Sequence, residues 1–223
     1  MFNRIVFAYA TYVNYNVINF LDGFEMKKTT NVRTQLMEDT QHKLISAARI
    51  AFAEQGYANT SMDEFTAAVG LTRGAIYHHF GSKKGLFAEV VKQIDAEIDA
   101  QLLNISNNAK DPWEGLYQRG KAYLEMVLDP EIQQILLIDA KSVLGSELSK
   151  IQMQCIESVE QLLKKGMDNS DIQLTNATTL AVFINGSLTE AAFWIANDEK
   201  PQARLPEAID CWTVLMNGLK IKN

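Results

Sequence analysis

Arginine, tyrosine, histidine and lysine side chains gather in one short stretch, RGAIYHHFGSKK, which runs from Arg73 to Lys84. All of them donate hydrogen bonds, and Arg and Lys add positive charge, so they suit phosphate groups and base edges. The two adjacent histidines raise a metal site as an alternative. They lie about 100° apart on a helix, and no Cys, Asp or Glu stands near them at ligand spacing, so metal binding is the weaker interpretation.

No set of residues suggests catalysis. The chain has three histidines and two isolated cysteines, Cys155 and Cys211, and it lacks a GxSxG motif and a glycine-rich phosphate loop. We therefore expect no enzyme, no cofactor and no metal. Because neither cysteine has a CxxC partner, the sequence predicts buried reduced thiols and a cytoplasmic protein.

Two short helices with a tight turn between them would position the basic side chains. Ser61 can cap the first helix, with Glu64 at the capping-box position, and Gly70 stands where a left-handed stop is needed. Thr72 can then cap a second helix. The apolar side of the first helix consists of Met62, Phe65, Ala68 and Val69, and Leu71 fills the turn. This layout is typical of a helix-turn-helix.

The second helix has one apolar side and one side suited to DNA. Ile76 and Phe80 anchor it to the core, and the outward rows are Arg73 with Tyr77 and Gly74 with His78. The major groove is about 12 Å wide and admits such a helix if its outer face is not bulky, which Gly74 favours.

A third helix start follows directly. Ser82 can cap it, and its free N–H groups, together with Lys83 and Lys84, suit a phosphate, as does His79 just before it.

These residues resemble a known family. The segment AARIAFAEQGYANTSMDEFTAAVGLTRGAIYHHFGSKKGLF, within residues 44–87, is similar to the N-terminal domain of the tetracycline-repressor (TetR/AcrR) family of bacterial regulators. The resemblance implies that the recognition helix contacts double-stranded DNA through Thr72, Arg73, Gly74, Tyr77 and His78. It implies phosphate contacts for Thr60, His79 and Lys83. It also implies a repressor that binds a palindromic operator as a homodimer.

The whole chain fits an all-α fold with a three-helix head, a long connecting helix and a helical bundle. Apolar periodicity and breaker residues predict helices at 38–55, 82–103, 112–128, 130–144, 146–167, 175–196 and 204–220. We expect residues 38–83 to bind DNA and residues 84–223 to bind ligand and dimerise. Residues 1–37 would be an extension, either disordered or translated from an upstream start, with Met26 or Met37 as the true one. Its apolar run at 5–13 is too short to cross a membrane.

The charge is divided between these parts. The net charge is −6, but residues 26–92 carry nine Lys or Arg and six Asp or Glu, whereas residues 93–223 carry eleven and nineteen. A basic head on an acidic body can approach DNA with one end, because charge effects fade over a Debye length of about 8 Å.

The last two predicted helices carry apolar stripes that fit either the core of the chain or an interface. The resemblance implies that these helices pair with their copies in a dimer. The candidate interface residues are Ile184, Leu188, Ala191, Ile195, Ile209, Trp212 and Met216.

Aromatic and soft apolar residues of the body suggest a site for a small-molecule effector, although simple packing explains each of them equally well. The candidates are Trp113, Tyr117, Tyr123, Met126, Leu137, Met153, Phe183 and Trp194. Asp139 and Glu190 interrupt apolar runs; such an acid either faces solvent or selects a cationic ligand. The sequence thus predicts a ligand-responsive regulator, with a helical dimeric interaction module that does not bind DNA as the alternative.

Overall fold

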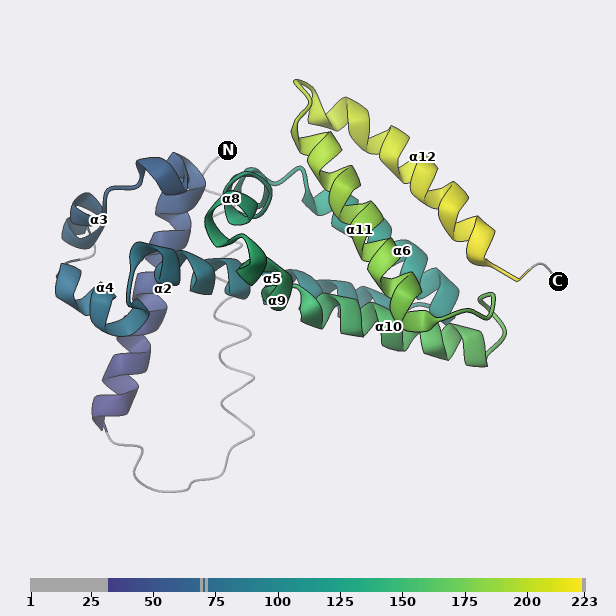
Figure 1. The fold of residues 1–223 in the computed structure, drawn as a ribbon, viewed down its shortest axis with the longest axis horizontal. Helices are drawn as coiled ribbons and strands as arrows, with labels where there is room; N and C mark the ends of the chain where they lie inside the picture. Colours follow the sequence, from purple (N-terminus) through teal and green to yellow (C-terminus); the bar gives the residue numbers. More distant parts are fainter. Residues whose placement is uncertain (1–31, 69, 71, 222–223) are drawn as a thin grey trace. The chain divides into compact units, whose positions relative to one another are not determined.

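The computed structural model describes residues 32–68, 70 and 72–221, and these residues form an all-helical chain (Figure 1). The helices are α2 (Val32–Asn59), α3 (Met62–Ala68), α4 (Arg73–Phe80), α5 (Lys83–Asn107), α6 (Pro112–Met126), α7 (Pro130–Ile132), the π-helix η1 (Gln133–Asp139), α8 (Ala140–Leu144), α9 (Ser146–Ile151), α10 (Met153–Asp168), α11 (Ala177–Ala196) and α12 (Pro201–Leu219). The predicted fold class is confirmed.

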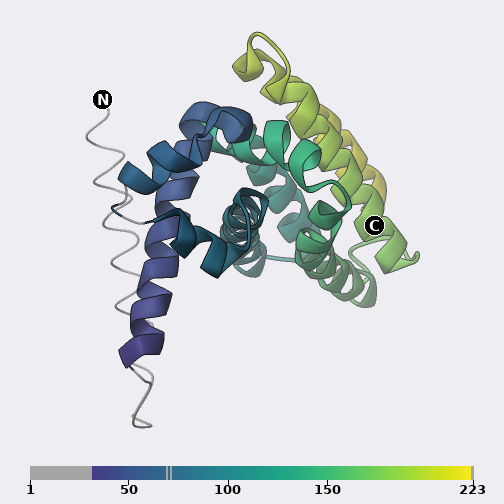
Figure 2. The ribbon, with the colours of Figure 1, turned by 60° about the vertical axis from the view of Figure 1, so that its left-hand side comes forward.

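One apolar cluster holds α2, α3 and α4 against α5 and includes residues of η1 and α8. Figure 2 shows the course of these helices. Phe52 of α2 and Phe87 of α5 are fully buried, with ring centroids 5.1 Å apart in an edge-to-face arrangement, and the Tyr57 ring lies 5.0 Å from that of Phe87. Aromatic pairs in this geometry stabilise by more than their buried area alone. Ile76 anchors α4 to the same cluster, as its spacing predicted.

Helix α2 contains a kink at Gly56, whose φ of 74° and ψ of 160° are not helical. Only glycine adopts a positive φ without strain, so Gly56 ends the regular part of the helix, close to the predicted end at residue 55. The kink turns Tyr57 toward α5, where its ring joins the aromatic contacts described above.

The helix-turn-helix forms as the capping pattern predicted. The Ser61 hydroxyl accepts a hydrogen bond from the Glu64 amide at 3.4 Å, and Gly70 has a φ of 67°. The Ser82 hydroxyl accepts from the Gly85 amide at 3.0 Å and caps α5. Two predictions, Val69 on the apolar side of the first helix and Leu71 in the turn, lie outside the described residues.

The body is a bundle in which α6, α10, α11 and α12 surround a second apolar cluster. Trp212 of α12 is buried and donates from Nε1 to the Tyr117 carbonyl at 2.9 Å, while Trp113 donates to the Met216 carbonyl at 2.8 Å. These two indoles join α6 and α12, because each satisfies its only donor on the opposite helix.

Three predicted elements differ in the structure. The predicted helix at 130–144 is one helical run with a π-helical segment at its centre, and the predicted helix at 146–167 is interrupted at Gln152 between α9 and α10. Helix α12 begins at Pro201 rather than 204 and contains Pro206. Pro206 is the sixth residue of α12, where proline lacks the N–H that would bond to the carbonyl four residues earlier, and the helix continues past it.

The predicted extension at 1–37 is partly helical, because α2 starts at Val32. The rest of that prediction, including the alternative start at Met26, lies outside the described residues. Residues from Gln41 to Asn223 form one compact unit, so the predicted head and body share a unit from Gln41 onward.

Candidate DNA interface and effector site

Helix α4 presents its predicted outward face to solvent. Arg73, Gly74, Tyr77 and His78 are exposed, whereas Ile76, on the opposite side, is 1% exposed. The Arg73 guanidinium forms an ion pair with Asp63 of α3, with Nε and Oδ1 3.1 Å apart, and both side chains are more than half exposed. Such a pair contributes little energy and can exchange for another anion. Thr72 is also exposed.

Gly74 is not required by the packing of the chain. A Cβ built at this position would meet only the Thr72 hydroxyl, at 3.6 Å, which is an ordinary contact. Glycine inside a helix costs roughly 1 kcal/mol relative to alanine. The fold therefore does not explain this residue, whereas clearance for a surface that docks on α4 does.

The three predicted phosphate contacts differ in their surroundings. Thr60 is 5% exposed and its hydroxyl donates to the Gly56 carbonyl at 2.8 Å, so this side chain serves the kink of α2 and has no exposed hydroxyl to offer a phosphate. His79 is half-buried, with its ring 5.4 Å from that of His78. Lys83 is half-buried too, with Nζ 4.4 Å from the centre of the Tyr57 ring, and burial lowers the pKa of its amine.

Asp139 of η1 joins the head to the body. Its Oδ2 accepts hydrogen bonds from the Tyr57 amide at 2.8 Å and from Gln134 Nε2 at 2.9 Å. The Tyr57 amide follows the kink at Gly56, so the carboxylate satisfies a backbone donor at that irregular point of the chain. Asp139, for which the sequence left two interpretations open, thus serves this backbone contact.

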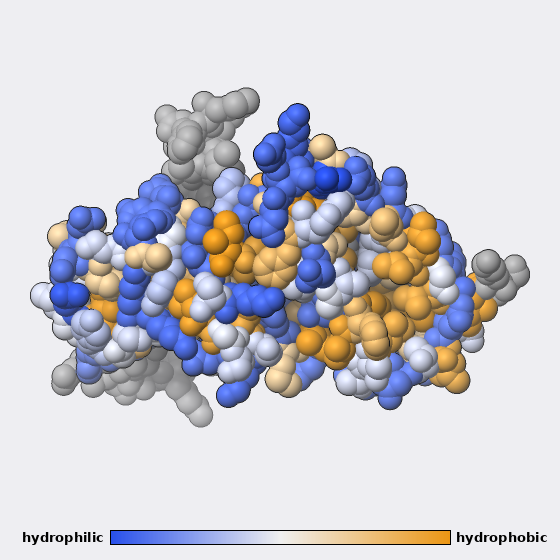
Figure 3. All heavy atoms as spheres, turned by 45° about the horizontal axis from the view of Figure 1, so that its top comes forward, coloured by the Kyte–Doolittle hydropathy of each residue, from blue (hydrophilic) through white to orange (hydrophobic). Residues whose placement is uncertain are grey.

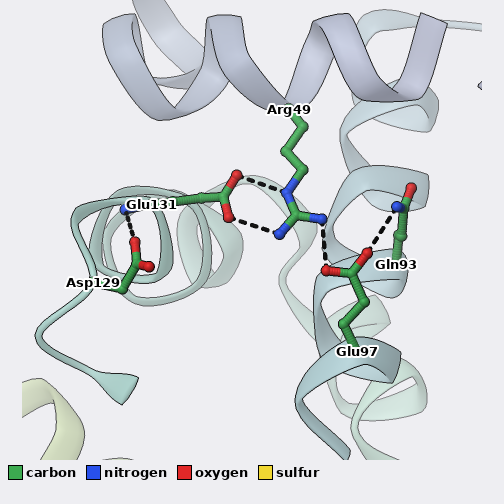
Figure 4. A network of polar contacts seen from close by, with 5 residues as sticks. All are labelled: Arg49, Gln93, Glu97, Asp129 and Glu131. Atoms are coloured by element: carbon green, nitrogen blue, oxygen red, sulfur yellow. Dashed lines mark hydrogen bonds and ion pairs between the residues drawn. The ribbon is translucent and has the colours of Figure 1, made fainter. Parts of the chain in front are cut away.

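A second polar contact between head and body centres on Arg49 (Figure 4). Nε and Nη2 of Arg49 donate to the two oxygens of Glu131 at 2.6 and 2.7 Å, and Nη1 donates to Glu97 Oε2 at 2.7 Å. Gln93 donates to the other Glu97 oxygen, and Asp129 accepts from the Glu131 amide. We call these five residues the Arg49 network.

The Arg49 network joins α2, α5 and α7 by charge. Burial alone would lower the pKa of the Arg49 guanidinium, but its hydrogen bonds to Glu131 and Glu97 raise that pKa overall, so the group stays charged. Arg49 is 11% exposed, and a bidentate pair at that depth holds a more defined geometry than a surface ion pair. The sequence does not reveal this network, because no local pattern marks which acidic residues α2 will meet.

The eight predicted pocket residues do not gather in one place. Leu137 and Trp113 are buried in the second apolar cluster, and Trp113 stacks on Tyr117 with ring centroids 5.6 Å apart. Met126 packs against the first cluster, and Tyr123 packs against both. The other three side chains are on the surface of the chain: Met153, Phe183 and Trp194. Their membership of an effector site stays a prediction.

A buried polar cluster lies inside the body instead. Arg119 of α6 is 3% exposed and Asp99 of α5 is 2% exposed. Arg119 Nη2 lies 3.4 Å from Asp99 Oδ1 and donates to the Ser158 hydroxyl of α10 at 2.9 Å, and that hydroxyl donates to Asp99 Oδ1 at 2.9 Å. We call Arg119, Asp99 and Ser158, with their charged and polar neighbours Asp95, Tyr123 and Cys155, the Arg119 cluster.

The Arg119 cluster leaves two buried atoms without a hydrogen-bond partner among the described residues. They are Asp99 Oδ2 and Arg119 Nη1. A buried charged group that lacks partners costs free energy, so such atoms usually mark a missing water, ion or ligand. Asp95 and Asp99 are four residues apart and share a face of α5, which is the one signal in the sequence that could have found this cluster.

Ionisable groups of the Arg119 cluster are perturbed by burial. Burial, with a contribution from the charge of Asp99, raises the pKa of Asp95 to about 6. Burial also raises the pKa of the Cys155 thiol to about 11 and that of the Tyr123 phenol to about 12. Cys155 is half-buried, whereas Cys211 is exposed on α12, so the prediction of a buried thiol fails for Cys211.

Helices α11 and α12 expose an apolar surface (Figure 3). Its large side chains are Val182, Phe183, Trp194, Val214 and Leu215, each at least 45% exposed. A groove of about 540 Å³ lies between the two helices, lined by Leu124, Ser187, Leu188, Glu190, Ala191, Trp194, Glu207, Ala208, Cys211, Trp212 and Leu215. An exposed apolar area of this kind marks an interaction surface.

The predicted interface residues divide into two groups. Ile184, Ile195, Trp212 and Met216 are at most 6% exposed and pack in the core of the chain. Their side chains are not available to a second copy, because the apolar stripes that suggested them cover the inward side of each helix. Leu188, Ala191 and Ile209 are partly buried at the edge of the same cluster.

Helix α11 is also long and apolar enough to cross a membrane, judged by length and composition alone. However, it packs against α6, α10 and α12, and its inward side chains Ala181, Ala192 and Ile195 are fully buried there. Its high hydropathy is explained by one face in the core and another in the exposed apolar surface.

Comparison with known proteins assigns the head and the body to one family of regulators. Residues 44–90 match the bacterial regulatory proteins of the tetR family, and residues 113–219 match the tetracyclin repressor-like C-terminal domain. The crystal structure of a TetR-family transcriptional regulator from Pectobacterium atrosepticum is similar, with a TM-score of 0.79 and 48% identity over 87% of this chain and 99% of that chain.

Curated relatives agree. The TetC protein of transposon Tn10 from Escherichia coli is 28% identical over 169 residues, which cover 75% of this chain and 85% of TetC. The HTH-type transcriptional regulator AcrR from Shigella flexneri is 33% identical over 144 residues, 59% of this chain and 66% of AcrR. This chain belongs to the tetR family and is a DNA-binding transcriptional regulator.

The raised pKa of Asp95 predicts how stability depends on pH. The folded state binds the Asp95 proton up to about pH 6, whereas the unfolded state releases it near the ordinary aspartate pKa of 3.8. Stability therefore falls as pH rises from about 4 to about 6, by an amount on the order of 2 kcal/mol once partial exposure is discounted. We expect Asp95→Asn to be more stable than the wild type at pH 7.5, with the difference narrowing toward pH 4, as measured by urea unfolding.

The exposed Asp168 at the end of α10 provides the matched control. Asp168→Asn should follow the wild-type pH profile. A profile for Asp95→Asn that also follows the wild type would show that the pKa of Asp95 is not raised in the folded state.

Proposed function

We propose that this protein represses transcription in the cytoplasm as a homodimer that binds a palindromic operator and releases it when a small-molecule effector binds the body. The observation that carries the proposal is the outer face of α4, where Arg73, Gly74, Tyr77 and His78 are exposed on a helix that Ile76 anchors. Repression rather than activation rests on the family, whose C-terminal domain is described as tetracyclin repressor-like.

The residues of α4 would contact different parts of the DNA. Arg73 can give up its exposed pair with Asp63 and fork onto a guanine, and the missing side chain of Gly74 lets the helix backbone approach the base edges. Tyr77 and His78 offer donors to phosphates, as does Lys83 at the start of α5. Thr72 lies at the start of α4, where backbone N–H groups favour an anion.

The exposed surface of α11 and α12 supports a dimer. The side chains that we assign to the interface are the exposed ones, Val182, Phe183, Trp194, Val214 and Leu215, in place of the buried residues suggested by periodicity. A two-fold pairing through this surface would put one α4 on each side of the symmetry axis. An operator with half-sites about 34 to 36 Å apart, one turn of DNA, would then be required.

Two polar contacts support a route from the body to the head. Asp139 holds the Tyr57 amide, and the Arg49 network holds α2 to α5 and α7. A ligand that displaces α7, η1 or α5 would change the position of α2 and therefore of α4. A coupling free energy of about 1 to 3 kcal/mol would change operator affinity roughly 5- to 150-fold.

Operator binding distinguishes base contacts from phosphate contacts. We expect Arg73→Ala to cost about 1 to 3 kcal/mol and to relax one position of the site if Arg73 reads a base, whereas Lys83→Ala should weaken all sequences alike. The measurement is a salt-titrated gel shift on DNA that flanks the gene, with Gly74→Ala as a variant that keeps the fold but loses clearance. If no palindrome-dependent complex forms, a helical interaction module without DNA binding becomes the better assignment.

The dimer surface can be tested with one charge. Val214 is 72% exposed on α12, and Val214→Glu should leave the fold intact but give a monomer at micromolar concentration, because an unpaired carboxylate would be buried in the interface. Sedimentation velocity measures the outcome. Leu174→Glu, at an exposed site outside the helices, is the control and should stay dimeric. A dimer that persists in Val214→Glu contradicts the assigned surface.

The Arg49 network can be tested independently of any effector. Arg49→Met leaves two carboxylates without their partner, so α2 should be held less firmly and the operator affinity should fall about 5- to 20-fold. Amide hydrogen exchange should rise in α2 to α4 and stay unchanged in α10. Lys164→Met, which removes an exposed pair with Glu160, is the control. Unchanged operator affinity and exchange in Arg49→Met would rule out this route.

A further inference from the structure

The Arg119 cluster is the most unusual buried feature among the described residues. It places the buried Arg119 and Asp99 and the half-buried Asp95 among α5, α6 and α10, in a body whose buried residues are otherwise mainly apolar. The Asp95 carboxylate forms no hydrogen bond or ion pair with the residues that the structure describes. The contacts present in the chain therefore leave this cluster incomplete.

Charge balance defines what is missing. With all three groups ionised, Arg119 contributes one positive charge and Asp95 and Asp99 contribute two negative ones. A buried site with a net negative charge is costly unless a cation or a proton neutralises it. An added anion would increase the imbalance, so one positive charge is the complement of this site.

The unpartnered atoms define the chemistry of that charge. Asp99 Oδ2 is a buried acceptor without a donor, and both oxygens of Asp95 are acceptors as well. A group that meets them must donate hydrogen bonds, which ammonium and amidinium groups do and quaternary ammonium groups do not. Arg119 Nη1, the remaining unpartnered donor, would donate a hydrogen bond to an oxygen of the same ligand or of a water.

We propose that the Arg119 cluster is the polar end of the effector site and binds an organic cation that carries N–H donors, an ammonium or amidinium group held between the carboxylates of Asp95 and Asp99. This inference rests on the proposed effector-controlled function. The position suits an effector, because Asp95 and Asp99 belong to α5, the helix that continues to the head, and Tyr123 packs against both apolar clusters.

The cation would compete with a proton on Asp95. The groups that face Asp95 are Asp99 on its own helix, Tyr123 on α6 and Cys155 on α10, while Arg119 of α6 pairs with Asp99. The phenol and the thiol stay neutral near pH 7, because burial raises both of their pKa values above 10. Asp95, with a pKa of about 6, is then the group whose ionisation controls binding, so affinity for the cation should increase as pH rises through 6.

Three small molecules that are similar in shape but differ in charge test the proposal on the full chain. Benzamidinium is the cationic probe, benzamide the neutral control and benzoate the anionic control, and isothermal titration calorimetry measures binding at pH 7.5. We expect saturable binding of benzamidinium only. The affinity should fall about tenfold at pH 5, one unit below the pKa of Asp95, and at least tenfold in Asp95→Asn. Asp168→Asn should bind like the wild type.

Each other outcome overturns the proposal. Binding of benzoate would assign the site to anions through Arg119, and failure of all three probes at millimolar concentration would leave a buried water as the occupant. If Asp95→Asn bound benzamidinium as tightly as the wild type, the cation would bind at another site. The pH dependence of the wild type is decisive even if a variant fails to fold. A separate gel shift distinguishes the two proposals, because loss of operator binding with intact benzamidinium binding would contradict the repressor but not the site.

Discussion

Helix α5 packs against the head helices at one end and against the body helices at the other. The arrangement of the chain follows from this constraint. Its first turns, with Leu86, Phe87 and Val90, close the core of the three head helices. Farther along, Asp99 contacts Arg119 of α6 and Ser158 of α10 in the body. Because α5 is continuous, any rotation or shift in the body is carried to the head, unless other contacts oppose it.

Some of those other contacts are apolar, through Ile135, Ala140 and Leu144 in the first apolar cluster, and the directed ones are polar. The bidentate pair of Arg49 with Glu131, and the carboxylate of Asp139 on the Tyr57 amide, both join α2 to the segment from α7 to η1. An apolar contact has no preferred direction, whereas a directed hydrogen bond to a charged group is lost when its atoms separate by an ångström or so. The head is thus held by apolar packing and by polar contacts that define its orientation.

The same contrast describes the Arg119 cluster. A body that needed only stability would be served as well by apolar residues, since a buried ion pair often contributes no more than well-packed hydrophobic side chains. Here the pair is also incomplete, with an unpartnered oxygen on Asp99 and an unpaired carboxylate on Asp95. A group that costs stability in the free protein is the kind of group that a ligand can use.

The sequence by itself determined the all-α fold, the helix-turn-helix, its caps at Ser61 and Ser82 and the outward face of α4. Each of these depends on residues within a few positions of one another, so local patterns record it. Only the tertiary structure decided which sides of α11 and α12 stay uncovered, because both sides are apolar and the choice depends on α6 and α10. It also withdrew Thr60 from the surface and brought Arg49 to Glu131 and Asp99 to Arg119. These contacts join residues far apart in the chain, and no local periodicity records which distant charge a side chain will meet.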